Sequence, residues 1–376
     1  MPSGSPASQS ESSLKRTRRR RWARLALFNL VVAVVLLELG LRVAGGELFP
    51  PRFFEAHAQF GHFHVPGRTG WQRTDEYSSY ITINGRGLRD HERPYAKPEG
   101  VFRILVLGDS FVEGLQVGQD ETFPARLEEA LNQDNSAPLD VINAGVSRYG
   151  TSNALLFLEG EGLRYQPDLV IYAFYPNDVT DNIENGLFEL AGNQLIARPA
   201  TVSPVEHVRG VLYDLSYIYR FALGLSLHLG QATDETLIDT GWGKVLPIYR
   251  AHLLPREERA WQVTGLLLER MHAATTRAGA RLVVVCLPEH FQSEDRLWAQ
   301  VAQSAEVLER DAPNRALAEA VPEGTAYLDL LPGFQAAAQS QALYYAQDHH
   351  FNAAGHALAA DLIATYLAGQ GLLPES

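Results

Sequence analysis

Five short apolar runs, separated by segments with helical periodicity, constrain the fold of this chain most strongly. The runs are FRILVLG (102–108), LDVINAG (139–145), DLVIYAF (168–174), RLVVVCLP (281–288) and TAYLDL (325–330). Short runs of this kind are typical of strands buried on both faces. Because strands that alternate with helices form βαβ units, the pattern predicts an α/β fold. We expect three α/β/α layers around a doubly wound, parallel, five-stranded sheet.

Helical patterns occupy most of the intervals between these runs. They cover Glu121–Asn132, Thr151–Arg164, 256–279 and Ala353–Ala368. One interval is longer, because an insertion at about 180–255 follows the third run. It contains a predicted hairpin, GLFELAGNQLIAR, and an apolar helical stretch with Tyr213, Tyr217 and Tyr219. These tyrosines either line a substrate pocket or pack in a core.

The amino-terminal segment predicts membrane attachment. Residues 1–24 carry seven Lys/Arg against one acid, and Leu25–Leu37 is an uncharged apolar run. The segment Leu25–Ala44 has the roughly 20 residues that cross a bilayer, provided that the charges of Glu38 and Arg42 are tolerated. These two residues are spaced i, i+4, so they can pair on one helix face. The basic flank places residues 1–24 in the cytoplasm as a basic tail and 25–46 as a signal-anchor.

A cleaved signal peptide is the alternative, because Ala44-Gly45-Gly46 offers small residues for cleavage. Both interpretations export the body of the chain, which we divide into a β-rich extension (47–100) and a main domain (101–372). In the extension, YSSYITINGRGLRD alternates and then turns at Asn84-Gly85, which predicts a hairpin or a small β-extension. The expected location is the inner membrane, single-pass, with a periplasmic body.

Charge and cysteine content exclude several kinds of function. The whole chain carries a net charge of −12 despite its basic amino terminus, so the body is strongly acidic. Such a body is a poor partner for nucleic acid. Cys286 is the single cysteine, which excludes an intramolecular disulfide and cysteine-based metal sites. His62 and His64 alternate as on one strand face, and without an acidic partner nearby in sequence they predict an ordinary strand.

Polar motifs follow the strands at the ends where an open α/β sheet binds ligands. They are Gly108-Asp109-Ser110, Asn143-Ala144-Gly145, Asn177-Asp178 and, before the last helix, Asp348-His349-His350. A serine needs a base to become a nucleophile, and a carboxylate can hold a histidine in the required tautomer. A glycine N–H and an asparagine amide can stabilise an oxyanion. The set therefore predicts acyl transfer.

In these four blocks the chain resembles the SGNH/GDSL hydrolase superfamily. The matching stretches are GDSFVEG (108–114), NAGVSRYG (143–150), PNDVTDN (176–182) and DHHFNAAGH (348–356). The resemblance covers about residues 80–370 and implies the flavodoxin-like SGNH fold, with no metal and no cofactor. It also implies a catalytic set of Ser110 (nucleophile), His350 (base) and Asp348, and an oxyanion hole of Ser110, Gly145 and Asn177.

The histidine block departs from the usual Asp-x-x-His spacing of the family. Asp348 lies two residues before His350, whereas the residue three positions before His350 is Gln347. A backbone carbonyl is therefore an alternative partner for the base. Asp109 has the simpler interpretation of a helix cap, and Gly145 that of a tight turn.

The sequence thus predicts a membrane-anchored serine esterase that acts through an acyl-serine intermediate. The expected substrate is an O-acyl or O-acetyl ester on an envelope glycan or lipid. Two alternatives stay open. The same residues would serve an O-acetyltransferase that modifies an exopolysaccharide, or the fold would serve a non-catalytic glycan-binding protein. The sequence leaves the oligomeric state open.

Overall fold

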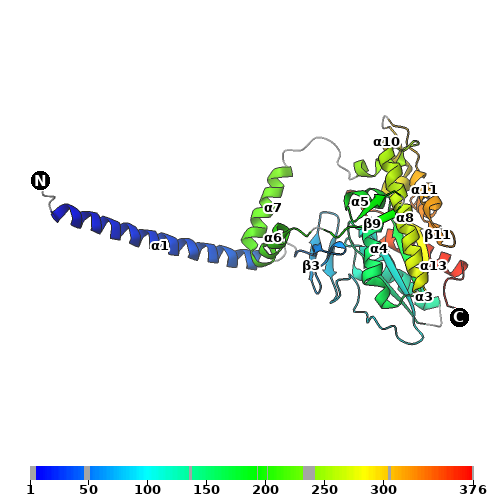
Figure 1. Ribbon diagram of the computed structural model, residues 1–376, viewed down its shortest axis with the longest axis horizontal. Coiled ribbons are helices and arrows are strands. Elements are labelled where there is room, and N and C mark those ends of the chain that lie inside the picture. The colour runs from blue at the N-terminus through cyan, green and yellow to red at the C-terminus, as the bar shows by residue number, and fades with distance from the viewer. Residues whose placement is uncertain are drawn as a thin grey trace. The chain divides into compact units, whose positions relative to one another are not determined.

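The computed structural model describes residues 6–45, 51–134, 138–192, 194–200, 202–231, 242–303 and 306–374. The chain divides into two compact units (Figure 1). The smaller unit consists of residues 1–50 and 208–236, and the larger consists of residues 51–207 and 237–376.

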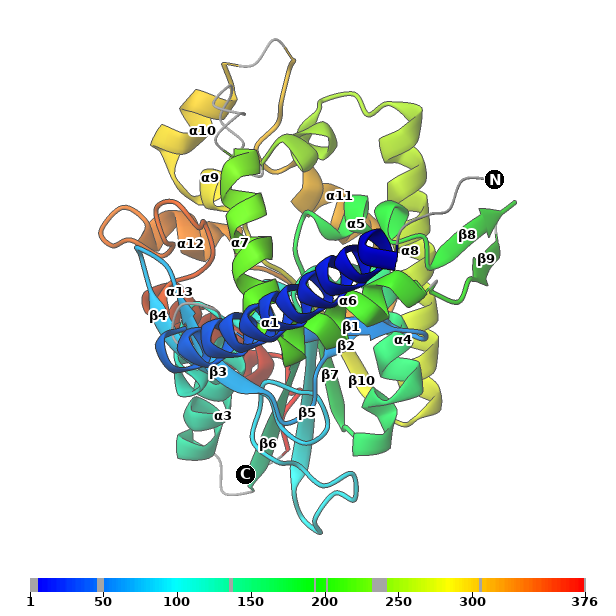
Figure 2. The same ribbon diagram turned by 90° about the vertical axis from the view of Figure 1, so that its left-hand side faces the viewer.

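A parallel five-stranded sheet organises the larger unit, as the apolar runs predicted. Its strands are β5 (Phe102–Gly108), β6 (Leu139–Gly145), β7 (Leu169–Phe174), β10 (Arg281–Cys286) and β11 (Ala326–Asp329). They lie in the order β6-β5-β7-β10-β11, and the paired strands are all parallel (Figure 2). This is the doubly wound order of the flavodoxin type, which confirms the predicted fold class.

Helices cover both faces of this sheet because alternate side chains of each strand point to opposite sides. Leu105 and Leu107 of β5 pack with α4 (Thr151–Gly160) and α8 (Pro255–Arg277). Ile104 and Val106 pack with helices on the other face. Those helices are α3 (Phe123–Asp134), α12 (Leu331–Ala337) and α13 (Ala353–Gly369).

Short elements complete the larger unit. The helices are α2 (Ser110–Glu113), α5 (Asp178–Glu184), α9 (His290–Ser293), α10 (Asp295–Val301) and α11 (Ala312–Ala320). The 3₁₀ turns are η1 (Gln119–Glu121), η2 (Gly162–Tyr165), η3 (Trp242–Lys244) and η4 (Leu246–Tyr249). In the insertion, β8 (Phe188–Ala191) pairs antiparallel with β9 (Gln194–Ala197), as predicted.

The β-rich extension contains two hairpins, and the predicted turn at Asn84-Gly85 is present. The first hairpin joins β1 (Phe54–His57) to β2 (Gly61–His64), and the second joins β3 (Thr69–Arg73) to β4 (Ser78–Thr82). The second hairpin turns at 74–77. The predicted turn follows β4: the N–H of Gly87 donates to the Asn84 carbonyl, and Asn84 Oδ1 accepts the N–H groups of Arg86 and Leu88. Among the described residues no strand pairing spans this turn.

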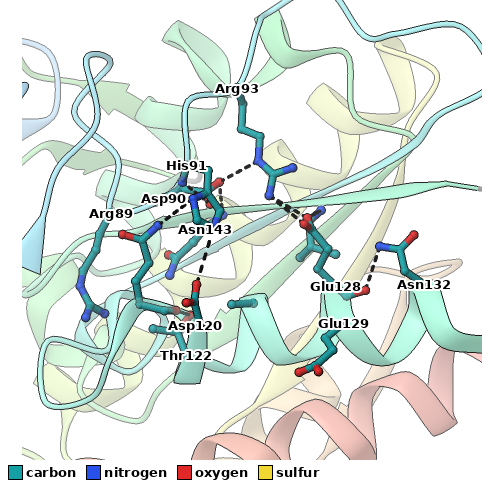
Figure 3. A pocket seen from close by; sticks show the side chains of 13 residues that line it. Arg89, Asp90, His91, Arg93, Asp120, Thr122, Glu128, Glu129, Asn132 and Asn143 are labelled. Atoms are coloured by element: carbon teal, nitrogen blue, oxygen red, sulfur yellow. Dashed lines mark hydrogen bonds and ion pairs between the residues drawn. The ribbon is translucent and has the colours of Figure 1, made fainter.

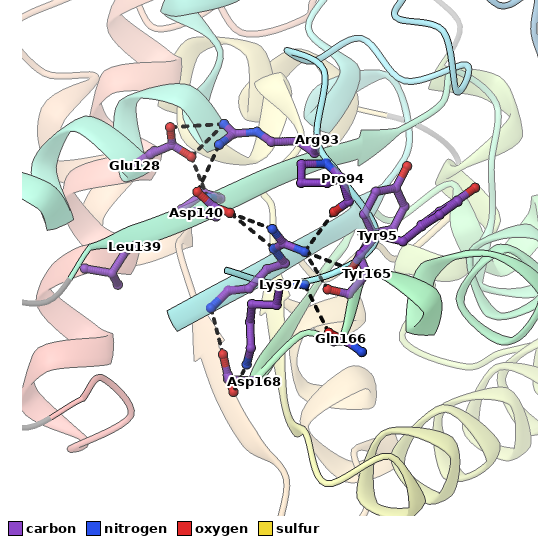
Figure 4. A network of polar contacts seen from close by, with 12 residues as sticks. Arg93, Pro94, Tyr95, Lys97, Glu128, Leu139, Asp140, Tyr165, Gln166 and Asp168 are labelled. Carbon is purple, nitrogen blue, oxygen red and sulfur yellow. Dashed lines mark hydrogen bonds and ion pairs between the residues drawn. The ribbon is translucent and has the colours of Figure 1, made fainter. Parts of the chain in front are cut away.

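A buried arginine fastens the segment before β5 to the sheet (Figure 4). The Arg103 guanidinium is fully buried and pairs with Asp140 at 2.8 Å. It also donates to the carbonyls of Pro94, Tyr95 and Tyr165. A buried charge is tolerated only when its hydrogen bonds are satisfied, and these contacts fix residues 94–95 against two strands.

In its described residues, the smaller unit holds three helices. They are α1 (Pro6–Ala44), α6 (Pro204–Leu215), whose last eight residues belong to this unit, and α7 (Tyr217–Gln231). Within α1, the segment Arg16–Ala44 is long and apolar enough to cross a membrane, and its most apolar stretch is unburied. Length and composition alone would equally fit a signal sequence.

Candidate active site

Three side chains from distant parts of the sequence meet at the carboxyl end of β5. Ser110 Oγ lies 2.7 Å from His350 Nε2, and His350 Nδ1 lies 2.7 Å from Asp348 Oδ1. Ser110 is the first residue of α2, and Asp109 caps this helix by accepting the N–H of Phe111. The two-residue spacing of Asp348 and His350 therefore permits a direct carboxylate–imidazole contact.

The electrostatics of this array suit a base. Burial lowers the pKa of His350, but the hydrogen bond and charge of Asp348 outweigh it, so the pKa is raised above its ordinary value. For Asp348, burial raises the pKa, but the hydrogen bond and charge of His350 lower it by more, so the net shift of the pKa is downward. Tyr77 O–H donates to Asp348 Oδ2 at 3.3 Å, and Asp348 N–H donates to Glu76. The β-extension thus holds the carboxylate.

The predicted oxyanion donors differ in their availability. The side chain of Asn177, at the start of α5, makes no hydrogen bond with the described residues. The N–H of Gly145 is already engaged, since it donates to Asn143 Oδ1 at 3.0 Å. A Cβ at Gly145 would lie 2.3 Å from the backbone nitrogen of Glu113, so the glycine lets α2 approach β6. Three residues on, Arg148 has φ 66° and its N–H finds no acceptor in the described part of the chain.

A buried contact between a histidine and a glutamate was missed by the sequence analysis. His64 Nε2 lies 2.7 Å from Glu113 Oε1, and both side chains are fully buried. His62 and His64 lie on strand β2, as predicted, but His64 has an acidic partner that is 49 positions away in the sequence. The other oxygen of Glu113 accepts the N–H and hydroxyl of Ser147. Glu113 thus links α2, the loop after β6 and the β-extension.

A second chain of polar side chains begins at His349, next to the base. His349 Nδ1 lies 2.9 Å from His290 Nδ1, and His290 Nε2 lies 2.9 Å from Glu294 Oε1. Burial lowers the pKa of both histidines, which favours their neutral forms. Because the Glu294 carboxylate only accepts, His290 donates through Nε2 and accepts through Nδ1. His349 then donates through Nδ1, and its Nε2 keeps a lone pair.

Three buried carboxyl groups surround the array. Burial raises the pKa of Asp109 and of Glu289 to about 7 each. Burial, together with the nearby Asp109 charge, also raises the pKa of Asp178, whose Oδ2 accepts the hydroxyl of Tyr172. These groups therefore protonate far above the pH at which an exposed carboxyl does.

A cavity of about 340 Å³ lies beside β6 and α3, apart from this array (Figure 3). None of Ser110, His350 and Asp348 lines it. Its charged groups are paired among themselves or with neighbours, as in the 2.8 Å contact of Arg93 with Glu128. Figure 3 shows the Arg93 side chain directed toward Asp90 and Glu128.

A doubly wound, five-stranded parallel sheet with a Ser-His-Asp array at its carboxyl edge is the arrangement of an α/β enzyme that performs acyl transfer. Within that class the chain belongs to the GDSL-like lipase/acylhydrolase family, whose model matches residues 106–358. It is an ester hydrolase of the SGNH type, which confirms the resemblance found in the four motifs.

Solved structures to which the chain is similar include Axe2, TesA and LAE5. Axe2 is described as an acetylxylan esterase from Geobacillus stearothermophilus; a catalytic mutant of it is 13% identical, with 72% of this chain and 94% of that chain covered and a TM-score of 0.40. TesA is 16% identical, with coverages of 72% and 99% and a TM-score of 0.40. LAE5, an α/β hydrolase from the metagenome of Lake Arreo, is 15% identical, with coverages of 75% and 99% and a TM-score of 0.39. These scores are too low to carry a conclusion about function.

One curated protein shares a shorter stretch. Protein nucleotidyltransferase YdiU of Nitrosospira multiformis is 37% identical over 87 residues, or 23% of this chain. The match spans only 15% of the length of that protein. Its activity is therefore not carried over.

Proposed function

We propose that this protein is a serine esterase that cleaves an O-acyl ester through an acyl-Ser110 intermediate. The observation that carries the proposal is the continuous contact from Ser110 Oγ through His350 to Asp348, with both distances 2.7 Å. A serine hydroxyl within hydrogen-bond reach of an oriented histidine is the geometry of an activated nucleophile.

The first half-reaction transfers the acyl group to the enzyme. Ser110 Oγ attacks the carbonyl carbon while its proton moves to His350 Nε2, and Asp348 stabilises the imidazolium that forms. The tetrahedral oxyanion then collapses, and His350 gives the proton to the alcohol oxygen as the C–O bond breaks. The products of this step are the free alcohol and acyl-Ser110.

The second half-reaction uses water. The oxygen of a water molecule attacks the acyl carbon while His350 takes a proton from that water. His350 then returns a proton to Ser110 Oγ as the bond from Ser110 Oγ to the acyl carbon breaks. A carboxylic acid leaves. If a sugar hydroxyl replaces water in this step, the same residues perform O-acyl transfer, so the two activities differ only in the acceptor.

In our proposal the oxyanion is stabilised by the N–H of Ser110 and the amide of Asn177. Gly145 can contribute its N–H only if its bond to Asn143 opens. Donors fixed before the reaction cost no reorganisation when charge develops.

The alcohol part of the substrate is proposed to be a glycan. His349 adjoins the base in sequence, and its ring contacts Trp242 with centroids 4.7 Å apart. The contacts of His290 and Glu294 leave a lone pair on His349 Nε2, which can accept a hydrogen bond from a neighbouring hydroxyl. An acceptor of this kind favours a polyhydroxy alcohol over a simple lipid. We further propose that α1 anchors the enzyme in the inner membrane and that the larger unit faces envelope glycans in the periplasm.

Labelling with a fluorophosphonate tests the proposal directly. The full chain in detergent would be treated with the probe and mapped by peptide mass spectrometry, with Ser110→Ala and the exposed-site variant Ser340→Ala as controls. We expect an adduct on the Ser110 peptide in the wild type and in Ser340→Ala, and none in Ser110→Ala. A folded wild-type protein without an adduct would overturn the proposal. Mixing an acetylated oligosaccharide with the enzyme then distinguishes acetate release from transfer to a second sugar.

A further inference from the structure

The helices α6 and α7 form a hairpin that is held together by a buried arginine. The Arg220 side chain is 7% exposed and donates to the carbonyls of Tyr213 and Asp214 at the end of α6. Its guanidinium also lies over the rings of Tyr213 and Tyr217, at 4.9 and 4.3 Å from their centroids. These tyrosines therefore pack on Arg220 within the smaller unit.

This hairpin leaves an apolar stripe exposed. On α6 the stripe consists of Val208, Val211, Leu212 and Leu215, whose exposed fractions lie between 42% and 65%. At about 100° per residue these positions share one side of the helix. On α7, Phe221 and Leu225 are four positions apart, so they share one side of that helix, and both are exposed. Soluble proteins seldom expose a contiguous surface of large apolar side chains, and such a surface marks contact with a partner or a membrane.

The hairpin is joined to the membrane-spanning candidate α1 through a helix cap. Glu38 of α1 accepts the N–H groups of Tyr217 and Ile218 at 2.9 and 3.0 Å and the hydroxyl of Ser216 at 3.1 Å. A carboxylate at a helix amino terminus is favourable because it meets unpaired N–H groups and the positive end of the dipole. Figure 1 shows the end of α1 beside α6 and α7.

Arg42 completes this junction. Its guanidinium pairs with Glu38 at 3.0 Å, as the i, i+4 spacing predicted, and donates to the carbonyl of Leu215. It also lies 5.3 Å from the centroid of the Tyr217 ring. Two charges that would be costly in a membrane helix are thus matched by polar groups of the hairpin.

The position of Glu38 along α1 sets the depth of the junction. At 1.5 Å per residue, the uncharged run from Leu25 to Leu37 spans about 20 Å. A bilayer core is about 30 Å thick, so Glu38 lies about 10 Å short of a full crossing if Leu25 marks the near edge. Interfacial helices lie about 5–10 Å into the headgroup boundary. A hairpin attached at Glu38 therefore lies at the depth of an interfacial helix.

We infer that the α6–α7 hairpin lies in the outer leaflet of the bilayer, with its apolar stripe in contact with lipid. This inference rests on the proposed anchoring of α1. The stripe contacts lipid rather than protein because the hairpin is held by hydrogen bonds to Glu38 of α1, the segment that would cross the membrane. The exposed polar residues of α6 include both Glu206 and Arg209, so neutral lipid is sufficient and an anionic headgroup is not required.

Site-directed spin labelling of the full chain tests this placement. Single cysteines would be introduced as Val208→Cys, in the stripe, and Glu206→Cys, about 200° around the same helix. The native Cys286 is buried, and the unmodified chain measures its background labelling. Each protein would be reconstituted in phosphatidylcholine vesicles, and collision of the label with oxygen and with a water-soluble nickel chelate would be measured. We expect the label at 208 to favour oxygen and the label at 206 to favour nickel.

A third label separates this inference from the anchoring on which it depends. A Leu30→Cys label in the apolar run of α1 reports whether α1 is in the bilayer. If the label at 30 is immersed but the label at 208 is as accessible to nickel as that at 206, the inference is wrong and the anchoring stands. If the label at position 30 is itself accessible to nickel, α1 is not in the bilayer, and the inference is overturned together with the proposed anchoring. A label at 208 shielded from both reagents means that protein, such as a second copy, covers the stripe, which also overturns the inference.

Discussion

Glu113 Oε1 lies 2.7 Å from His64 Nε2 although the two residues are 49 positions apart in the sequence. Glu113 ends the helix that begins with Ser110, and its second oxygen binds Ser147 in the loop after β6. The pair is fully buried, so its two members depend on each other: a buried charge without its partner is strongly destabilising.

Removal of His64 should therefore destabilise the protein. We expect His64→Ala to lower the free energy of unfolding by about 3–5 kcal/mol at neutral pH, because it leaves Glu113 uncompensated. Burial raises the pKa of Glu113, but the contact with His64 lowers it by more than burial raises it. The net pKa is therefore below the ordinary value of 4.5. The stabilisation is thus present above pH 4.5 and is lost as the pH falls, so the deficit should shrink in acid. Thermal unfolding at several pH values measures this, with the exposed His91→Ala as control. An equal deficit at all pH values would contradict the assignment.

The role of Asp348 can be read from a pH profile. His350 must be neutral to accept a proton, so kcat/KM should rise with pH through a pKa above 6.5, the value from which it is raised. In Asp348→Asn the carboxylate is lost, so this apparent pKa should fall and kcat should drop by about 10⁴. The exposed Asp361→Asn, on α13, should leave both unchanged. Wild-type kcat in Asp348→Asn would instead favour the backbone carbonyl that the motif spacing left open.

Asn177 is expected to act on the transition state rather than on substrate binding. Loss of one preorganised oxyanion donor lowers kcat by about 10²–10³, with little change in KM. We therefore expect this result for Asn177→Ala, measured with an acetyl ester in parallel with Asn185→Ala at the other end of α5. A change confined to KM would mean that the amide binds the substrate but does not stabilise the oxyanion.

The titration of Glu289 should lower the free energy of unfolding as the pH rises. Burial raises its pKa from 4.5 to about 7 in the folded state. The folded chain therefore holds the proton more tightly than the unfolded chain, and stability falls between about pH 4.5 and 7. Because Glu289→Gln removes this titration, the variant should gain on the wild type as the pH rises, by at most on the order of 3 kcal/mol. Chemical unfolding at pH 5 and pH 8 measures the gain, and Glu319→Gln, on the surface of α11, is the control. A constant difference would refute the prediction.

The amino-acid sequence predicted the larger features of the fold because they depend on local patterns. All five strands were placed from apolar runs such as 102–108 and 169–174, whose burial on both faces is visible as continuous hydrophobicity. Because parallel strands bring their carboxyl ends to one edge, the motifs at Ser110 and Asn177 could be expected to lie together, and the family model matches the residues that carry them.

Contacts between distant segments decided what the sequence could not. The turn at Asn84-Gly85 was predicted from its residues, but the hairpin turn at 74–77 was not, because the pairing of β3 with β4 sets it. The engagement of the Gly145 N–H by Asn143 depends on loop geometry that no composition encodes. Tyr213 and Tyr217 were weighed as pocket or core residues, and they lie on Arg220.

The sequence by itself thus determined the fold class, the family and the segment able to cross a membrane, because periodicity, strand-end motifs and a long apolar run are properties of neighbouring residues. Only the tertiary structure decided which buried charges are paired and which apolar side chains remain exposed. Glu113 with His64, and Glu38 with the start of α7, are carboxylates whose partners are 49 and 179 positions away. Such pairings arise from three-dimensional packing, which alone sets the distance between two charges and the water around them.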